Sequence, residues 1–255
     1  EFTSVNATGD SGQKPEIKFV GNDSSLSYCQ FNGLFQTRGQ GEVNQVTHCS
    51  FDSKTPQANN DDSRQKIEFK CNQISYNTFD GVAATFEMIS GSSFIYADNT
   101  NTGGSVEVRL EDGTDTAEIK NNQLTDTALK VRVQQQTPTL ITGNRIESNS
   151  NYEKGLDLDG NKDSVQTTVE YNTITGWQVG INSQSANLIR YNNIYNNGIN
   201  LKNDVNWKQV EMNAGNNWWG TLDASLIAAK IIDYHDDINK GKVNYSPLLT
   251  QAYDG

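Results

Sequence analysis

The segment Ile189-Arg190-Tyr191-Asn192-Asn193-Ile194 contains a six-residue pattern, apolar-x-x-Asn-x-apolar, that recurs through the chain. Earlier copies keep the two apolar ends and have a small or polar residue at the fourth position; they occupy residues 26–31, 46–51, 69–74, 89–94, 119–124, 141–146 and 169–174. Successive copies begin 20 to 30 residues apart. Self-similarity at this period predicts a stack of coils in which each repeat contacts its neighbours.

Each copy is predicted to form a short strand, a bend and a second short strand, because apolar and polar residues alternate on both sides of the fourth position. Asn suits a bend, since it tolerates left-handed backbone angles. Its amide can also donate to, and accept from, an identical amide one coil away. We therefore expect a ladder formed by Asn122, Asn144, Asn172 and Asn192.

A third strand is expected in each coil after a turn; the candidate segments are residues 128–133, 155–158, 179–182 and 198–201. Three strands per coil predict an all-β, single-stranded parallel β-helix of about eight or nine coils, in one domain spanning residues 15–249. Residues 1–14 are predicted to be disordered, and residues 250–255 to form a tail. Within a cap over residues 216–249, a short helix is expected to begin at Thr221 or Asp223.

Residues 26–249 resemble a known family, and the C-terminal part carries the most specific stretch of the resemblance. The segments that carry the resemblance are 191–198, 216–221 and 241–249. In these segments the chain is similar to secreted right-handed parallel β-helix repeat proteins with pectate-lyase-like folds or NosD-like repeats. The resemblance implies a right-handed helix with a closing cap, and a secreted or cell-surface location. It transfers no catalytic residue, so it informs the fold more than the activity.

Composition excludes some classes of function. The net charge of −11 argues against nucleic-acid binding, and no apolar run approaches the ~20 residues that a membrane span needs. We expect a monomer without membrane insertion. Cys29 and Cys49 occupy equivalent positions in successive coils, so they form either a disulfide or two buried thiols, and Cys71 lies out of register.

Opposite charges are predicted to face each other on two neighbouring third strands. If Leu129 and Leu156 point inward, Lys130, Arg132, Asp157 and Asp159 point outward, which sets Lys130 beside Asp157 and Arg132 beside Asp159. This cluster is either a surface ladder of ion pairs or a catalytic site beneath the insertion at residues 147–154. In the resembled family such an outer face carries polysaccharide lyases, epimerases and hydrolases, with Lys or Arg as the base.

Calcium is a candidate cofactor of the same region. Asp157, Asp159, Asn161 and Asp163 form an alternating run of oxygen ligands. The run lacks the final Glu of an EF-hand loop, and Asp159-Gly160-Asn161 is also an ordinary turn sequence. Long insertions, where function is often carried, are predicted at residues 36–45, 53–65 and 99–117.

Aromatic residues supply a second candidate surface. Trp177, Tyr195 and Trp207, beside Asn182 and Asn200, are candidates for gripping the faces of sugar rings. The favoured hypothesis is an extracellular module that binds polysaccharide. The alternative is a calcium-dependent lyase or epimerase acting on an acidic glycan. A third hypothesis, ice binding, comes from the pairs Thr125/Thr127, Thr137/Thr139 and Thr173/Thr175.

Overall fold

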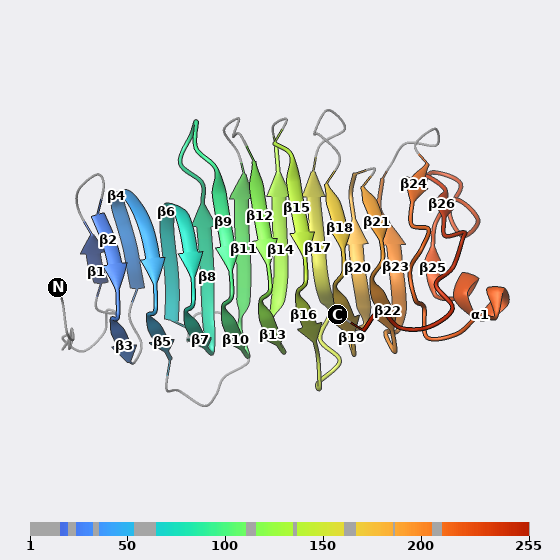
Figure 1. The fold of residues 1–255 in the computed structure, drawn as a ribbon, viewed down its shortest axis with the longest axis horizontal. Helices are drawn as coiled ribbons and strands as arrows, with labels where there is room; N and C mark the ends of the chain where they lie inside the picture. The colour runs from blue at the N-terminus through green and yellow to red at the C-terminus, as the bar shows by residue number, and fades with distance from the viewer. Residues whose placement is uncertain are drawn as a thin grey trace.

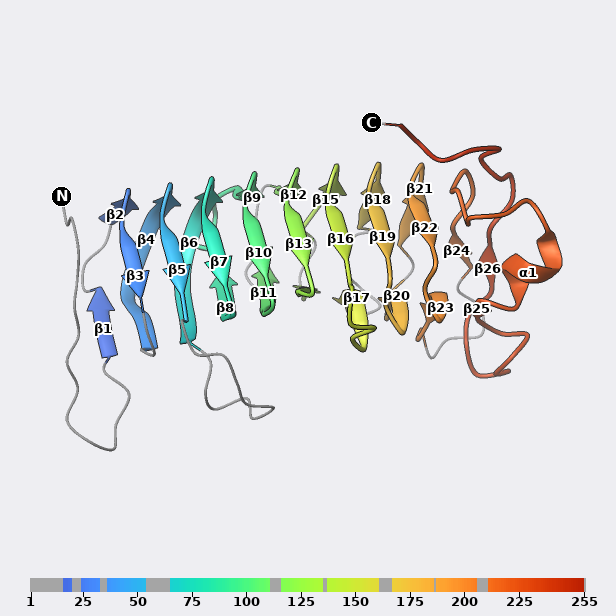
Figure 2. The same cartoon turned by 90° about the horizontal axis from the view of Figure 1, so that it is seen from below.

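The fold is a stack of coils in which parallel strands build two sheets along a rod (Figures 1 and 2). The computed structural model describes residues 16–19, 24–32, 36–53, 65–110, 116–134, 137–160, 167–185, 187–205 and 211–254. Every strand pair among them is parallel and joins strands of adjacent coils; for example, Leu129 lies opposite Leu156, and Leu156 lies opposite Ile181. The predicted parallel β-helix is confirmed.

The larger sheet contains the first and third strands of the coils. Its strands are β1 Glu16–Phe19, β2 Ser24–Ser27, β4 Gln36–Thr47, β6 Gln65–Ser75, β8 Val82–Glu87, β9 Phe94–Ala97, β11 Ser105–Leu110, β12 Ala117–Lys120, β14 Ala128–Val133, β15 Thr139–Thr142, β17 Lys154–Gly160, β18 Thr168–Glu170, β20 Val179–Ser183, β21 Leu188–Arg190, β23 Ile199–Asn203, β24 Met212–Asn213, β25 Ile231–Ile232 and β26 Val243–Asn244. The predicted third strands correspond to β14, β17, β20 and β23.

The smaller sheet stacks the short second strand of each coil. Its strands are β3 Gln30–Asn32, β5 Ser50–Asp52, β7 Thr78–Asp80, β10 Thr100–Thr102, β13 Gln123–Thr125, β16 Arg145–Glu147, β19 Thr173–Thr175 and β22 Asn193–Tyr195. About six of these coils are regular, which is slightly fewer than the eight or nine coils predicted. The difference lies at the ends, because β4 and β6 run from one coil into the next without a break and the last strands have two residues.

Burial alternates along the strands, so one narrow apolar core runs the length of the rod. In β11 and β14 every second side chain is buried. Near the N-terminal end the inward position of the second strand carries Phe31, Phe51 and Phe79, whose rings stack at centroid distances of 4.8 and 5.1 Å. Inward residues of successive coils therefore pack on one another along the axis.

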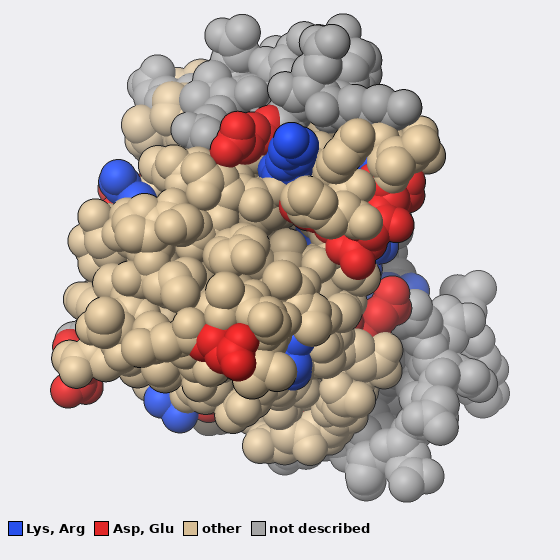
Figure 3. Space-filling view, turned by 90° about the vertical axis from the view of Figure 1, so that its right-hand side faces the viewer, with Lys and Arg blue, Asp and Glu red and all other residues tan. Residues whose placement is uncertain are grey.

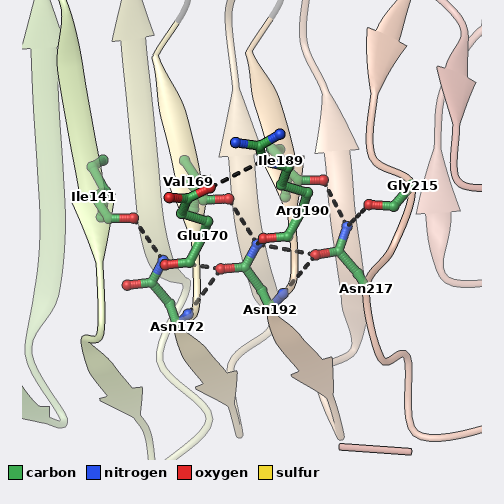
Figure 4. A network of polar contacts seen from close by, with 9 residues as sticks. All are labelled: Ile141, Val169, Glu170, Asn172, Ile189, Arg190, Asn192, Gly215 and Asn217. Carbon is green, nitrogen blue, oxygen red and sulfur yellow. Dashed lines mark hydrogen bonds and ion pairs between the residues drawn. The ribbon is translucent and has the colours of Figure 1, made fainter. Parts of the chain in front are cut away.

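The predicted asparagine ladder is present and longer than expected. Its members are Asn77, Asn99, Asn122, Asn144, Asn172, Asn192 and Asn217. At each junction Nδ2 and the backbone N–H of one Asn both donate to Oδ1 of the next; for Asn172 and Asn192 both distances are 2.9 Å (Figure 4). Nδ2 also donates to a main-chain carbonyl of the preceding coil, so these buried amides are satisfied.

Two of the predicted repeat copies are wrong. Ile74 pairs with Val46 and with Tyr96, so the true copies occupy residues 74–79 and 96–101 instead of 69–74 and 89–94. Within the long strand β6 the apolar spacing also occurs five residues before the true copy, and Asn72 has there the position of a ladder residue. As a consequence, the insertion predicted at 36–45 falls on β4, whose pairing with β6 shifts register between Arg38 and Glu42. The insertion predicted at 99–117 falls largely on β10, β11 and the start of β12, and its residues 111–115 lie outside the described residues. Most of the third, at 53–65, lies outside the described residues, as do residues 1–14.

The bend also lies one residue earlier than predicted. Positive φ values occur at the third position, for example 56° at Asn121 and 59° at Tyr171, and not at the ladder Asn. This left-handed residue bends the chain so that the next side chain points into the core, where its amide reaches its neighbours. The ladder Asn is therefore selected for its hydrogen-bonding groups rather than for its backbone freedom.

The C-terminal cap contains the expected short helix, α1 Ala224–Ala228. Asp223 caps it by accepting hydrogen bonds from the N–H groups of Ser225 and Leu226 at 2.8 and 3.3 Å. Ile227 and Trp219 are buried against the last coils. Figure 3 shows this end as a mainly uncharged face with separate acidic and basic side chains.

The three cysteines are free and buried, which resolves the open alternative in favour of thiols. Cys29 and Cys49 take the ladder position in two N-terminal coils, and each thiol donates to a main-chain carbonyl two residues earlier. Cys71 lies inside β6, opposite Val43. Burial raises the pKa of the Cys49 thiol to about 12 and raises that of Cys71 as well.

Candidate functional site

The predicted charged cluster lies on the outer faces of β14 and β17. Lys130 is opposite Asp157 and Arg132 is opposite Asp159, as expected from the repeat. The ion pairs only partly follow this register. Arg132 Nε is 3.1 Å from Asp159, whereas Lys130 Nζ also approaches Asp159, at 3.4 Å. Asp157 instead pairs with Lys154 at 3.2 Å and accepts a hydrogen bond from Asn182 Nδ2 at 2.8 Å.

Glu107 joins the cluster from β11, and the sequence did not assign it there. Its carboxylate lies 2.8 Å from Arg109, 3.5 Å from Arg132 and 3.9 Å from Lys130. Because residues 99–117 were interpreted as an insertion, Glu107 appeared to lie on a loop. The Val106-x-Val108-x-Leu110 alternation is the signal that would have identified its strand.

A cavity of about 480 Å³ opens beside this cluster. Its lining comes from four successive coils and includes part of the loop that joins β16 to β17: Gly104, Ser105, Val106, Glu107, Asp126, Ala128, Lys130, Tyr152, Glu153, Lys154, Asp157 and Trp177. The loop overhangs the outer face of β14, as its length predicted. This volume lies within the usual range for ligand sites.

Hydrogen bonds hold the overhanging loop at both ends. Asp126 accepts from the Ser148 hydroxyl at 3.0 Å and from the Asn149 N–H at 2.8 Å. The carbonyls of Tyr152 and Glu153 accept from the N–H groups of Gln178 and Val179 in the next coil. Between these anchors the ring of Tyr152 stays 46% exposed on the wall of the cavity. The wall is therefore preformed.

Trp177 lies beneath this wall and is fully buried, so its predicted role as an exposed sugar platform is wrong. Its Nε1 donates to the Ile146 carbonyl at 3.1 Å. A Cβ on Gly155 would lie 2.9 Å from the indole, so glycine is needed where β17 crosses the ring. Trp177 and Tyr152 have ring centroids 6.5 Å apart, and the buried indole thus supports the exposed phenol.

The other predicted aromatic and amide residues do not form one surface with it. Tyr195 is half-buried at the end of β22, and Asn200 is buried, accepting a hydrogen bond from Asn197. Asn182 is buried behind Asp157, and its Oδ1 has no hydrogen-bond partner among the described residues. Trp207 lies outside the described residues.

The calcium prediction can be followed only in part, because Asn161 and Asp163 lie outside the described residues. Asp157 and Asp159 are already neutralised by Lys154, Lys130 and Arg132, so these two carboxylates do not by themselves fit a calcium ion. Within the described part of the chain no group of three or more His, Cys, Asp or Glu side chains could hold a metal. Calcium binding stays a prediction.

The threonine pairs do not form a regular array. Thr127, Thr137 and Thr139 are buried, whereas Thr125, Thr173 and Thr175 lie on the outer face of the smaller sheet. Between them on this face, Arg145 and Glu147 form an ion pair at 2.7 Å. The threonines therefore do not provide the regular surface on which the ice-binding hypothesis depends.

The fold and the cavity define a parallel β-solenoid with a candidate ligand site at one corner of its coils. Comparisons with protein-family models, with curated proteins and with solved structures found no match. No helix in the described residues is long and apolar enough to cross a membrane.

Proposed function

We propose that this protein is an extracellular module that binds polysaccharide in the cavity beneath the loop of residues 148–153. The observation that carries the proposal is the exposed ring of Tyr152 on the wall of a preformed cavity of about 480 Å³. A phenol ring offers an apolar face to a sugar ring, and the polar groups around it can hydrogen-bond to hydroxyls. The sequence resemblance to secreted β-helix proteins supports the extracellular location.

The charges around the cavity favour binding over catalysis. Lys130 and Arg132 each contact both Glu107 and Asp159, so their charges are shared between two carboxylates. Lys154 is likewise paired with Asp157. Such a network presents donors and acceptors at fixed positions on a rigid sheet, which suits the recognition of hydroxyl groups.

The test is a glycan array followed by calorimetric titration of the best ligand. We expect binding by the unchanged protein and at least a tenfold loss of affinity in Tyr152→Ala, which is about 1.4 kcal/mol. Tyr76→Ala is the matched control, since Tyr76 is also exposed (56%) but does not line the cavity. The proposal is wrong if no glycan binds, or if both variants bind as tightly as the unchanged protein.

The same cavity supports one alternative, a lyase or epimerase acting on an acidic glycan, because Lys130 and Asp157 line it. In that reaction Lys130 would take the proton alpha to a uronate carboxylate; in a lyase the glycosidic C–O bond would then break and leave an unsaturated product. Incubation with pectate, alginate and glycosaminoglycans, with and without calcium, tests for a lyase by ultraviolet absorbance and for an epimerase by NMR of the treated glycan. Activity that survives Lys130→Ala combined with Arg132→Ala would exclude this site.

A further inference from the structure

A second cavity, of about 460 Å³, lies at the corner where the first and second strands meet, close to the asparagine ladder. Its lining residues are Asn121, Thr142, Gly143, Asn144, Arg145, Tyr171, Thr173 and Tyr253. None of them was assigned to the polysaccharide or calcium site from the sequence, and Thr173 appeared only among the threonines considered for ice binding. Two of them are tyrosines and none is a carboxylate, which differs from the acidic lining of the first cavity.

The cavity exists because a glycine interrupts a row of side chains that occupy the same position in successive coils. The third position of the repeat, which has positive φ, carries Tyr28, His48, Tyr76, Asp98, Asn121, Gly143, Tyr171, Tyr191 and Asn216. Neighbouring rings in this row stack on each other; Tyr171 and Tyr191 have centroids 5.5 Å apart and planes inclined by 9°. At Gly143 the row is interrupted. A slot therefore opens between Asn121 and Tyr171, two coils apart, or about 9.6 Å at the usual strand spacing.

The C-terminal tail forms another wall of this slot. The Tyr253 N–H donates to Asn193 Oδ1 at 2.7 Å, and Asn193 Nδ2 donates to the Tyr253 carbonyl at 2.9 Å. This pair of hydrogen bonds fixes the tail on β22. The ring of Tyr253 lies 4.9 Å from that of Tyr171 at an inclination of 47°, so two rings border the same space at an angle.

Polar groups lie at the base of the slot. Asn121 Oδ1 is 2.6 Å from the place where a Cβ on Gly143 would lie, so it points into the vacated space. Arg145 binds Glu147 through Nε at 2.7 Å, and its side chain remains 65% exposed. An acceptor, a guanidinium and two aromatic faces are the groups that hold a pyranose ring and its hydroxyls.

The two cavities flank the same short strand. Arg145, at the start of β16, lines the second cavity, and the loop that overhangs the first begins directly after Glu147, at the end of β16. A strand of three residues spans only about 10 Å. The outer face between them carries the hydroxyls of Thr173 and Thr175 and the Arg145–Glu147 ion pair. An extended chain can thus reach both cavities across the smaller sheet.

We propose that the slot at Gly143 is a second saccharide subsite, and that one glycan chain crosses the smaller sheet to occupy both cavities. This inference rests on the proposed polysaccharide binding and adds the ligand class: a linear oligosaccharide long enough to span both sites, with one pyranose between Tyr171 and Tyr253. Two subsites on one rigid body raise affinity for a chain that spans them, because the second contact is intramolecular.

The test measures affinity against oligosaccharide length, using a series built on the best array ligand. Gly143→Asn should fill the slot, since Asn already occupies this left-handed position at Asn121 and only the movable Asn121 side chain lies close to the new Cβ. Gly91→Asn is the matched control, because Gly91 also has positive φ (73°) and no atom of the described residues lies within 4 Å of the position that its new Cβ would take. Tyr253→Ala removes the ring without altering a coil.

In the unchanged protein we expect affinity to rise with length and then to level off. Gly143→Asn and Tyr253→Ala should lose about tenfold for long oligosaccharides and leave the shortest ones unaffected, whereas Gly91→Asn should match the unchanged protein. Thermal unfolding of each variant confirms that it is folded. If Tyr152→Ala weakens binding while both slot variants retain full affinity at every length, the second subsite is wrong and the proposed function stands. If the unchanged protein binds no glycan, both proposals fail.

Discussion

In each coil two corners flank the smaller sheet, and they differ in how much their length can vary. The corner before it repeats without variation in length, because the buried ladder amides must meet a partner in every coil. The corner after it varies: residues 103–104 and 126–127 make tight turns, whereas residues 148–153 form the loop that overhangs the first cavity. Buried polar groups thus fix the length of the first corner, whereas the solvated corner can accept an inserted loop.

The first corner itself has two parts. Asn fills the ladder position from Asn77 to Asn217, whereas Cys29 and Cys49 fill it in the N-terminal coils. A thiol donates and accepts hydrogen bonds only weakly, whereas an amide does both strongly. In the N-terminal part the stacked rings of Phe31, Phe51 and Phe79 supply the contact between coils instead. Stacked asparagine amides therefore connect the coils from Asn77 to Asn217, whereas stacked phenylalanine rings connect the N-terminal coils.

Breaking the ladder at its centre should have the largest effect. Asn144→Ala removes the Oδ1 that accepts from both Nδ2 and the backbone N–H of Asn122, and it removes the Nδ2 donor to Asn172 Oδ1, which keeps only the backbone N–H of residue 144. We expect a loss of about 3 kcal/mol or more in the free energy of unfolding, measured in urea. Gln123→Ala, an exposed change in the adjoining coil, should cost less than about 0.5 kcal/mol. Equal losses for the two variants would contradict the role of the ladder.

Alkaline pH should lower the stability of the N-terminal coils that contain Cys29 and Cys49. Burial raises the pKa of Cys49 from 9.0 to about 12, so the folded state keeps the thiol neutral where the unfolded chain ionises it. The stabilisation from this thiol is complete below about pH 9 and is lost as the pH rises towards 12. The stability of Cys49→Ala should therefore fall less steeply over this range. Parallel pH profiles for the two proteins would show that Cys49 makes no such contribution.

Extending the ladder should raise stability. In Cys49→Asn the new Nδ2 would reach Asn77 Oδ1, which already accepts from the backbone N–H of residue 49 at 2.9 Å. We expect a gain of about 1 kcal/mol in unfolding free energy. Cys71→Asn, which places the same amide inside β6 and away from the ladder, should destabilise the protein. A loss of stability in Cys49→Asn would show that the N-terminal coils are not interchangeable with the rest.

Removing a charge from the outer face of β14 should change the free energy of unfolding least. Arg132→Met keeps the aliphatic contact and deletes the pairs with Asp159 and Glu107, which are partly exposed. We expect a loss below about 1 kcal/mol that shrinks in 1 M salt. Urea titrations at low and high salt measure it. A larger loss that salt leaves unchanged would mean that the cluster is structural.

The six-residue repeat was enough to predict the fold, but the positions of several residues between the repeats could not be predicted. Lys130, Arg132, Asp157 and Asp159 could be placed because strict alternation and a constant coil height determine outward positions. Trp177 could not, since a turn residue in sequence can still insert into the core when glycine, here Gly155, leaves room. Glu107 and Tyr253 were missed because one lay in a misassigned repeat and the other reaches its neighbours from the tail.

The most direct test of the account is hydroxyl-radical footprinting of the tyrosines with and without the best array oligosaccharide. Tyr152, Tyr28 and Tyr76 are all exposed, but only Tyr152 lines the cavity at the variable corner. The account predicts that the ligand protects Tyr152 from oxidation and leaves Tyr28 and Tyr76 as reactive as before. Protection of Tyr28 and Tyr76 with no change at Tyr152 would contradict it.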